Sequence, residues 1–340
     1  MCRFILFILW ASGLKYNMKH ILYENGKRKW ISVVFILLLF AAGCMQTQTE
    51  TNSADGVVSS VSAEEEISSA DGETSGSSQT DADRETMEFT DVRGEVHTLQ
   101  INPYAAFHDY NVSCFVKDGQ DMLYTDTDAY ICRVGIDVSR YQGDIDWERV
   151  KEAGYTFVFI RIGLRGYGEA GNLAEDEMFQ ANLTEAKEAG LDVGVYFYSQ
   201  AVSEEEAAEE AAFVLELLGD AKLDLPVVYD PEYILDEDGN QIAEARTSGL
   251  DGEQITKNTV VFCETVEEAG YDTAYYTNLL SQSEVFDMEA LSGYTVWYAD
   301  YCDAPQTPYE FSFWQYSESG TVDGINGDVD LNIQLIRAED

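Results

Sequence analysis

The stretch "VKEAGYTFVFIRI" (Val150–Ile162) joins the end of a helical pattern to a β-rich run through one glycine. The same order returns in "AKEAGLDVGVYFYS" (Ala186–Ser199) and "VEEAGYDTAYYTN" (Val266–Asn278), and "LGDAKLDLPVVYD" (Leu218–Asp230) fills the interval between them. A glycine directly after a helix supplies the positive φ that ends it. Helices that alternate with strands in this way predict a parallel sheet.

The repeated pattern predicts where the individual elements lie. We expect helices at 146–153, 176–189, 203–218 and 253–269, and Ser203 with Glu206 forms a capping box for the third. We expect strands at 134–138, 157–162, 193–198, 226–230 and 273–277, followed by "TVWYA", "EFSFWQYS" and "VDLNIQL" with little helix between. This predicts an α/β fold, an irregular TIM-like barrel of five βα units plus three further strands. A doubly wound open sheet is the alternative.

The N-terminal part of the 340 residues is not expected to belong to this barrel. Residues 1–43 resemble a lipoprotein signal peptide whose start is Met18: the basic residues 27–29 precede the apolar run "WISVVFILLLFAAGC". Cys44 is then the lipidated first residue of the mature chain, and an ordinary secretory signal is the alternative. We expect residues 44–86 to form a disordered acidic tether. Residues 87–132 are expected to form a small β-rich segment, the prelude, with turns at Arg93-Gly94 and Asp118-Gly119. The barrel is expected to span residues 133–340.

The overall charge limits the possible partners. A formal net charge of −43 excludes nucleic acid as a partner, since the phosphate backbone would be repelled. We expect a monomer on the extracellular face of the bacterial cytoplasmic membrane, anchored through Cys44, or secreted if Cys44 is not lipidated. Export makes disulfides possible for Cys114, Cys132, Cys263 and Cys302, which allow three pairings. Cys114 and Cys132 flank a turn-rich stretch and are the expected pair, whereas free thiols are equally plausible for the other two.

The sequence argues against a dinucleotide-binding site and against histidine-based chemistry in the barrel. Gly166, Gly168 and Gly171 match the pattern G-x-G-x-x-G. A dinucleotide site needs a helix that begins at these glycines, but here the helical pattern starts only near Asp176. We interpret this segment as a loop over the barrel mouth. All three histidines precede the barrel, which excludes a Ser-His-Asp triad inside it and disfavours a histidine-ligated zinc. Barrel chemistry must therefore use carboxylates.

Four carboxylates fall at the ends of predicted strands. Asp230 and Glu232 flank Pro231 at the end of the fourth strand, where residues i and i+2 of an extended chain point the same way. Asp137 ends the first strand and Asp330 begins the last one, which neighbours the first if the barrel closes. Barrel enzymes place their chemistry at this face. Burial and mutual repulsion are expected to raise the pKa of Glu232, as a general acid requires.

The acids also have alternative interpretations. Each acid alone is more often a cap or a solvated loop residue, and a Mg²⁺ or Ca²⁺ site is the rival functional hypothesis. We expect no metal and no cofactor. The aromatic residues framing the same end suit stacking on sugar rings, although individually such residues more often belong to the core. The candidate substrate-binding residues are Tyr196, Tyr198, Tyr276, Trp297, Tyr301, Trp314 and Gln315.

Four motifs in order resemble one enzyme family. "GIDVSRYQGDIDW", "YDPE", "WYADY" and "WQYSESGTVDGINGDVDLN" resemble family 25 glycoside hydrolases over about residues 133–336. The resemblance implies N-acetylmuramidase activity on the β-1,4 bonds of peptidoglycan, with Glu232 as general acid. It implies that Asp230 orients or stabilises the acetamido group, and that Asp137 and Asp330 complete the site, so that a substrate-assisted step is plausible. A probable hairpin in "YILDEDGNQIAEA", turning at Asp238-Gly239, departs from the family pattern and could narrow the groove.

The sequence therefore predicts a lipid-anchored lysozyme whose substrate is the glycan strand of peptidoglycan. Two rivals stay open. One is a catalytically silent cell-wall glycan-binding lipoprotein on the same barrel, and the other is a barrel hydrolase that acts on a different polysaccharide.

Overall fold

The computed structural model describes residues 18–24, 27–33, 85–91, 93–236 and 239–338. The chain divides into two units, Met1–Gln48 and Thr49–Asp340. In the first unit, β1 (Met18–Glu24) and β2 (Lys27–Val33) pair as an antiparallel hairpin. The rest of the predicted signal peptide, Cys44 and the predicted tether up to residue 84 lie outside the described residues, and the tether's last residue, Thr86, begins β3. No helix in the part of the chain that the structure describes is long and apolar enough to cross a membrane.

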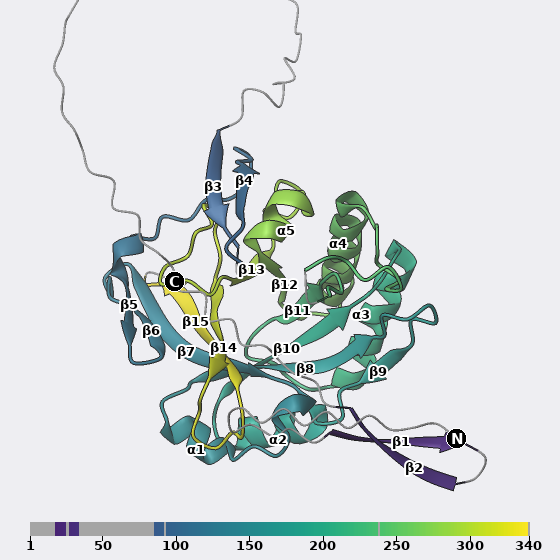
Figure 1. Ribbon diagram of the computed structural model, residues 1–340. Helices are drawn as coiled ribbons and strands as arrows, with labels where there is room; N and C mark the ends of the chain where they lie inside the picture. Colours follow the sequence, from purple (N-terminus) through teal and green to yellow (C-terminus); the bar gives the residue numbers. More distant parts are fainter. Residues whose placement is uncertain (1–17, 25–26, 34–84, 92, 237–238, 339–340) are drawn as a thin grey trace, which may run out of the picture. The chain divides into compact units, whose positions relative to one another are not determined.

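The second unit is built on a closed barrel of eight strands (Figure 1). Its strands in chain order are β7 (Tyr130–Val138), β8 (Phe157–Arg165), β10 (Asp192–Ser199), β11 (Val227–Pro231), β12 (Thr273–Asn278), β13 (Thr295–Ala299), β14 (Phe313–Gly320) and β15 (Val329–Arg337). Neighbours run parallel from β7 to β14, while β15 is antiparallel to both β14 and β7 and thereby closes the barrel. The predicted α/β barrel is confirmed, and the open doubly wound sheet is wrong.

Helices connect the parallel strands. They are α1 (Trp147–Glu152), α2 (Phe179–Glu188), α3 (Glu204–Leu218), α4 (Gly252–Glu268) and the short α5 (Leu279–Glu284), with 3₁₀ turns η2 (Val112–Cys114) and η3 (Arg140–Gln142). The four predicted helices and five predicted strands are present within a few residues of their expected ends. The ranges predicted from the sequence did not include α5 or β9 (Leu173–Glu175), which pairs antiparallel with β8.

The predicted helix ends are confirmed in large part. Gly154, Gly190, Gly219 and Gly270 have φ of 104°, 80°, 54° and 91°, so each ends its helix in the region that glycine favours. Ser203 caps α3 by accepting a hydrogen bond from the Glu206 N–H. The other half of the predicted box differs, because the Glu206 carboxylate accepts from the Val202 N–H at 2.9 Å instead of from Ser203.

The barrel interior has a core of its own. Strand residues facing inward form a cluster separate from the main core, made of Phe157, Phe159, Leu225, Val228, Ala274, Trp297 and Phe313. Glycine makes room for these rings: a Cβ on Gly135 would lie 2.4 Å from the Phe157 ring. Because these side chains fill the barrel interior, a ligand can bind only at an end of the barrel.

The prelude consists of two hairpins with the predicted turns. β3 (Thr86–Thr90) pairs with β4 (Val96–Gln100), and β5 (Phe115–Asp118) pairs with β6 (Asp121–Tyr124). The expected Cys114–Cys132 disulfide is wrong, since Cys114 and Cys132 are both free thiols, as is the buried Cys263. The first two lie partly buried against the main core, where a thiol packs as a small apolar group.

The glycine-rich segment is a tight connection between β8 and β9. The Gly166 N–H donates to the Asn172 carbonyl at 2.9 Å, and α2 begins only at Phe179. Because no helix opens at these glycines, the structure agrees with the exclusion of a dinucleotide site.

Candidate active site

The four predicted acids come from two sides of the barrel, the neighbouring strands β7 and β15 and the end of β11 across from them. Asp137 on β7 and Asp330 on β15 are directly opposite in the antiparallel register. Asp230 lies on β11, and Glu232 follows the last residue of that strand, Pro231. Asp137 and Asp230 are buried, whereas Glu232 and Asp330 are partly buried. Their charges influence one another across the barrel, so the structure brings all four together at the carboxyl ends of the parallel strands.

Asp137 is held by two amide donors. Gln315 Nε2 and Asn332 Nδ2 each donate to Asp137 Oδ2 at 2.8 Å. Sequence reasoning placed Gln315 among the substrate-binding residues, whereas here it binds an acid of the site. Asn332 was missed altogether. The signal for it was present in "DLNI", because Asp330 and Asn332 are two residues apart on one strand and share a face.

The pKa values of the acids follow from burial and from these contacts. Burial raises the pKa of Asp137, and the hydrogen bonds from Asn332, Gln315 and Asp330 oppose this effect. Burial, the charge of Asp137 and the hydrogen bond to it raise the pKa of Asp330 to about 9. Asp330 therefore holds a proton at neutral pH and donates it to Asp137 in a hydrogen bond that lowers the pKa of Asp137.

In the part of the chain that the structure describes, Asp230 and Glu232, the second pair of acids, are not held by amide donors in the way that Asp137 is. Burial and the charge of Asp137 raise the pKa of Glu232 to about 7. Burial and the charges of Glu232 and Asp137 raise the pKa of Asp230, while Arg161 lowers it. Oδ1 of Asp230 is buried without a hydrogen-bond partner among the described residues. Asp230 thus presents an unused acceptor beside an acid that can hold a proton near neutral pH.

Most of the predicted aromatic residues surround the acids. The hydroxyls of Tyr276 and Tyr301 donate to Gln315 Oε1 at 2.9 and 3.0 Å, and the indole N–H of Trp297 donates to Asn332 Oδ1 at 2.8 Å. The rings of Tyr196 and Tyr276 meet that of Trp297 edge to face, with centroids 5.7 and 5.0 Å apart. Trp297 is almost fully buried, so it orients the amide that holds Asp137.

Two other predicted residues have different positions. Tyr198 is paired in register with Asp230 and is partly buried, so it lies next to the acids. Trp314 is fully buried and packs edge to face on Phe115 of the prelude, with centroids 5.2 Å apart. It neighbours Gln315 in sequence and therefore faces the opposite side of the sheet. The structure does not bring Trp314 together with the acids, which argues against its predicted substrate contact.

A metal site was the rival hypothesis for the acids. Among the described residues, the one group of His, Cys, Asp and Glu with ligand atoms within 4.8 Å of one another is Asp91, Glu95 and His97 on the β3–β4 hairpin. Arg93 forms an ion pair with Asp91 there, at 3.1 Å. This group does not include any of the four site acids.

The sequence of residues 136–325, which carries the acids Asp137, Asp230 and Glu232, matches the family "Glycosyl hydrolases family 25". The chain belongs to this family.

Two relatives of the family 25 barrel have lysozyme names. Lysozyme M1 from Streptomyces globisporus is 32% identical over 219 residues, which cover 58% of this chain and 66% of that protein. The autolytic lysozyme from Clostridium acetobutylicum is 27% identical over 199 residues, which cover 58% of this chain and 54% of that protein. The chain therefore spans less than two thirds of the length of either relative.

The fold is similar to that of a bacterial autolysin whose structure has been solved. The modular autolysin LytC from Streptococcus pneumoniae superposes with a TM-score of 0.54 at 22% identity, covering 73% of this chain and 56% of that one. LytC has also been solved in complex with a synthetic peptidoglycan ligand, with a TM-score of 0.51 to this chain. At this level of identity the likeness shows the fold.

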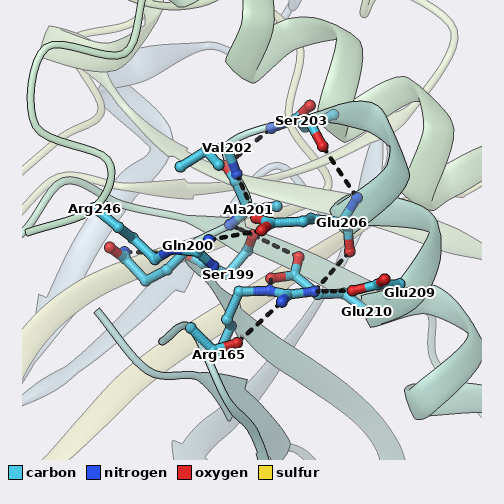
Figure 2. A network of polar contacts seen from close by, with 12 residues as sticks. Arg165, Ser199, Gln200, Ala201, Val202, Ser203, Glu206, Glu209, Glu210 and Arg246 are labelled. Atoms are coloured by element: carbon cyan, nitrogen blue, oxygen red, sulfur yellow. Dashed lines mark hydrogen bonds and ion pairs between the residues drawn. The ribbon is translucent and has the colours of Figure 1, made fainter. Parts of the chain in front are cut away.

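In this family 25 barrel, a polar network surrounds Gln200 in the loop between β10 and α3 (Figure 2). Gln200 Nε2 donates to the main-chain carbonyl of Glu232 at 2.6 Å, and Thr247 Oγ1 donates to Gln200 Oε1 at 2.9 Å. Gln200 is almost fully buried, so these bonds are shielded from water. They fix the peptide that follows the glutamate and tie it to the β10–α3 loop.

A buried ion pair lies in the same network (Figure 2). Arg165 Nε donates to Glu210 Oε1 at 2.7 Å, and Ser199 Oγ donates to Glu210 Oε2 at 2.7 Å. Burial raises the pKa of Glu210, and the hydrogen bonds from Ser199 and Arg165 oppose this effect. The pair joins β8 to α3 and to the end of β10, beside the loop that holds Gln200.

The segment after Glu232 forms the predicted hairpin. Leu235 and Gln241 make an antiparallel bridge, and the Ile242 N–H donates to the Ile234 carbonyl at 2.8 Å. Gly239 has φ of 79°, as the turn requires, whereas its predicted partner Asp238 lies outside the described residues. Further along, the Arg246 N–H donates to the Tyr167 carbonyl at 2.9 Å, which ties this segment to the β8–β9 connection.

Proposed function

We propose that this chain is a peptidoglycan hydrolase that cleaves the β-1,4 bond between N-acetylmuramic acid and N-acetylglucosamine. The observation that carries the proposal is the group of four acids at one end of a family 25 barrel, one of which, Glu232, has a pKa raised to about 7. Relatives named lysozyme support the choice of substrate. The proposal includes the predicted architecture of the barrel, in which five βα units are followed by three strands.

In this proposal Glu232 is the general acid. A carboxylic acid that keeps its proton up to about pH 7 can donate it to the oxygen of the leaving sugar. Its backbone is fixed by Gln200, so the carboxyl group starts from a defined position.

Asp230 supports the second half of the reaction. Its Oδ1 has no hydrogen-bond partner among the described residues and is free to accept from the N–H of an acetamido group or to stabilise positive charge at the anomeric carbon. Burial and the charges of Glu232 and Asp137 raise the pKa of Asp230 overall, and the charge of Arg161 opposes this effect. Asp137, held by amide donors and by Asp330, adds a fixed negative charge to the site.

We also propose that the protein is lipid-anchored through Cys44 on the extracellular face of the bacterial cytoplasmic membrane and acts there as a monomer. Support for the anchor comes from the basic residues, apolar run and small residues before Cys44 in the sequence. Incorporation of labelled fatty acid in the producing cells tests it, and labelling that persists in Cys44→Ala would contradict it.

The activity is tested with purified peptidoglycan and mass spectrometry of the released fragments. Fragments with N-acetylmuramic acid at the new reducing end are expected, and they should be lost in Glu232→Gln. The exposed Glu289 provides a matched control, because Glu289→Gln makes the same chemical change away from the site. Retention on the wall without any fragments would instead favour a glycan-binding protein, and fragments from a different polysaccharide only would favour the other hydrolase.

A further inference from the structure

Arg161 is a buried cation on the interior side of the barrel that the sequence analysis did not select. It follows Phe159 by two residues on β8, and Phe159 belongs to the interior cluster, so both side chains face the barrel axis. In register it is opposite Tyr196 on β10. Its side chain is 10% exposed. The guanidinium therefore lies in the mouth of the barrel among carboxylates.

Only part of this guanidinium is used within the protein. Nε donates to Asp176 Oδ2 at 2.7 Å. Nη2 lies 2.7 Å from the same oxygen as an ion-pair contact, but it makes no hydrogen bond among the described residues, and it is buried. The Cζ atom lies 5.2 Å from the ring centre of Tyr141, a residue that is 68% exposed at the rim. A buried donor without an acceptor is rare and destabilising, so it requires an explanation.

We propose that Arg161 is a substrate-binding residue whose Nη2 donates a hydrogen bond to the acyl oxygen of an N-acetylamino sugar. The inference rests on the proposed function and names a recognition group within that same site. It explains why the donor is left unpaired: its acceptor arrives with the glycan.

The surrounding charges select this acceptor over other groups of the substrate. A carboxylate would enter a mouth that already contains the buried acids Asp137 and Asp230, so repulsion disfavours it. A free amino group, as in a deacetylated sugar, would place a positive charge against the guanidinium. A neutral carbonyl oxygen avoids both penalties and accepts a charge-assisted hydrogen bond.

The inference is tested by binding, in the full-length chain carrying Glu232→Gln so that no turnover occurs. Sedimentation with three wall preparations measures affinity: native peptidoglycan, chemically N-deacetylated peptidoglycan, and the same material after re-acetylation. Binding is measured at 0.5 M salt, which shortens the range of non-specific attraction between the acidic protein and the cationic glycan to a few ångströms, on the order of 4 Å.

Three variants are compared in this background. Arg161→Met removes the donor, and Arg161→Lys keeps the charge beside Asp176 but loses the forked geometry. Arg140→Met is the matched control, since the Cζ of Arg140 also lies 5.2 Å from the Tyr141 ring but its side chain is 41% exposed. Thermal melting checks that each variant is folded, and the lysine variant keeps the test valid if Arg161→Met is not.

The expected result is a preference for acetylated over deacetylated wall in the parent and in Arg140→Met, restored by re-acetylation. This preference should fall by about tenfold or more in Arg161→Lys and Arg161→Met, the usual effect of one hydrogen bond to a charged group. An equal loss of affinity for both walls in these variants would overturn the inference while leaving the proposed function intact. A parent that binds none of the walls would instead overturn the proposed function.

Discussion

Replacing Glu232 by glutamine is expected to stabilise the fold in a pH-dependent way while abolishing activity. Burial and the charge of Asp137 raise the pKa of Glu232 from its ordinary 4.5 to about 7 in the folded chain. Below pH 4.5 the glutamate is protonated in both the folded and the unfolded chain, so it contributes no difference. Between pH 4.5 and 7 the unfolded chain loses this proton while the folded chain keeps it, and the free energy of unfolding therefore falls as pH rises.

The size of this effect follows from the two pKa values. Each pH unit between them corresponds to about 1.4 kcal/mol, so the full cost above pH 7 is at most about 3.5 kcal/mol. Glutamine has a similar shape and carries no charge at any of these pH values. Glu232→Gln should thus raise the free energy of unfolding by up to about 3.5 kcal/mol at pH 8 and change it little at pH 4.

Urea unfolding of the two proteins at pH 4, 6 and 8 measures the difference. Glu289→Gln serves as the control, because Glu289 is exposed and is not part of the site. A gain in stability that is equal at all three pH values, or a loss at pH 8, would refute the argument that Glu232 is held in a protonated form by its surroundings. It would also remove the physical basis for its role as general acid.

The rate of peptidoglycan cleavage should decline as pH rises through about 7, since Glu232 loses its proton there; an initial rate still increasing above pH 8 would contradict this. Asn332→Leu removes a donor to Asp137 and leaves the indole N–H of a buried tryptophan without its acceptor, so it should destabilise the fold by about 2–5 kcal/mol in urea unfolding and greatly reduce turnover. Glu210→Ala removes the buried carboxylate that pairs with Arg165 Nε, leaving the exposed Glu209 as the ion-pair partner, and should cost about 3–5 kcal/mol. Adding Arg165→Met should recover most of that loss, and a double variant as unstable as the single one would argue against an ion-pair effect.

The order and ends of the helices and strands could be predicted from local sequence because local physics determines them. Gly154, Gly190 and Gly270 end their helices through a backbone conformation that few other residues adopt, and each is followed by a β-rich run. Capping was predicted less well. Glu206 was expected to accept from the N–H of Ser203, but it accepts from Val202 one residue earlier. Small elements such as α5 also have too little periodicity to be recognised.

For the candidate site, the sequence supplied the acids but not all of their partners. Asp137, Asp230, Glu232 and Asp330 could be selected because strand ends and their spacing can be read along the chain. The acceptors and donors that control them come from elsewhere in the barrel. Gln315 was selected as a substrate-binding residue and its contact with Asp137 was not foreseen. Asn332 was missed although it ends a quoted motif, because its partner Asp137 lies 195 positions away. Arg161 was missed because it is a single cation within an apolar strand.

The sequence by itself determined the alternating βα pattern, the acids at the strand ends and the exclusion of a histidine-based triad, since these depend on residue type and on spacing along one chain. Only the tertiary structure decided that β15 closes the barrel between β14 and β7 and so places Asp330 opposite Asp137. It also decided which acid keeps a proton and that Trp314 faces away from the site. These properties depend on burial and on contacts between residues up to about two hundred positions apart, as for Asn332 and Asp137.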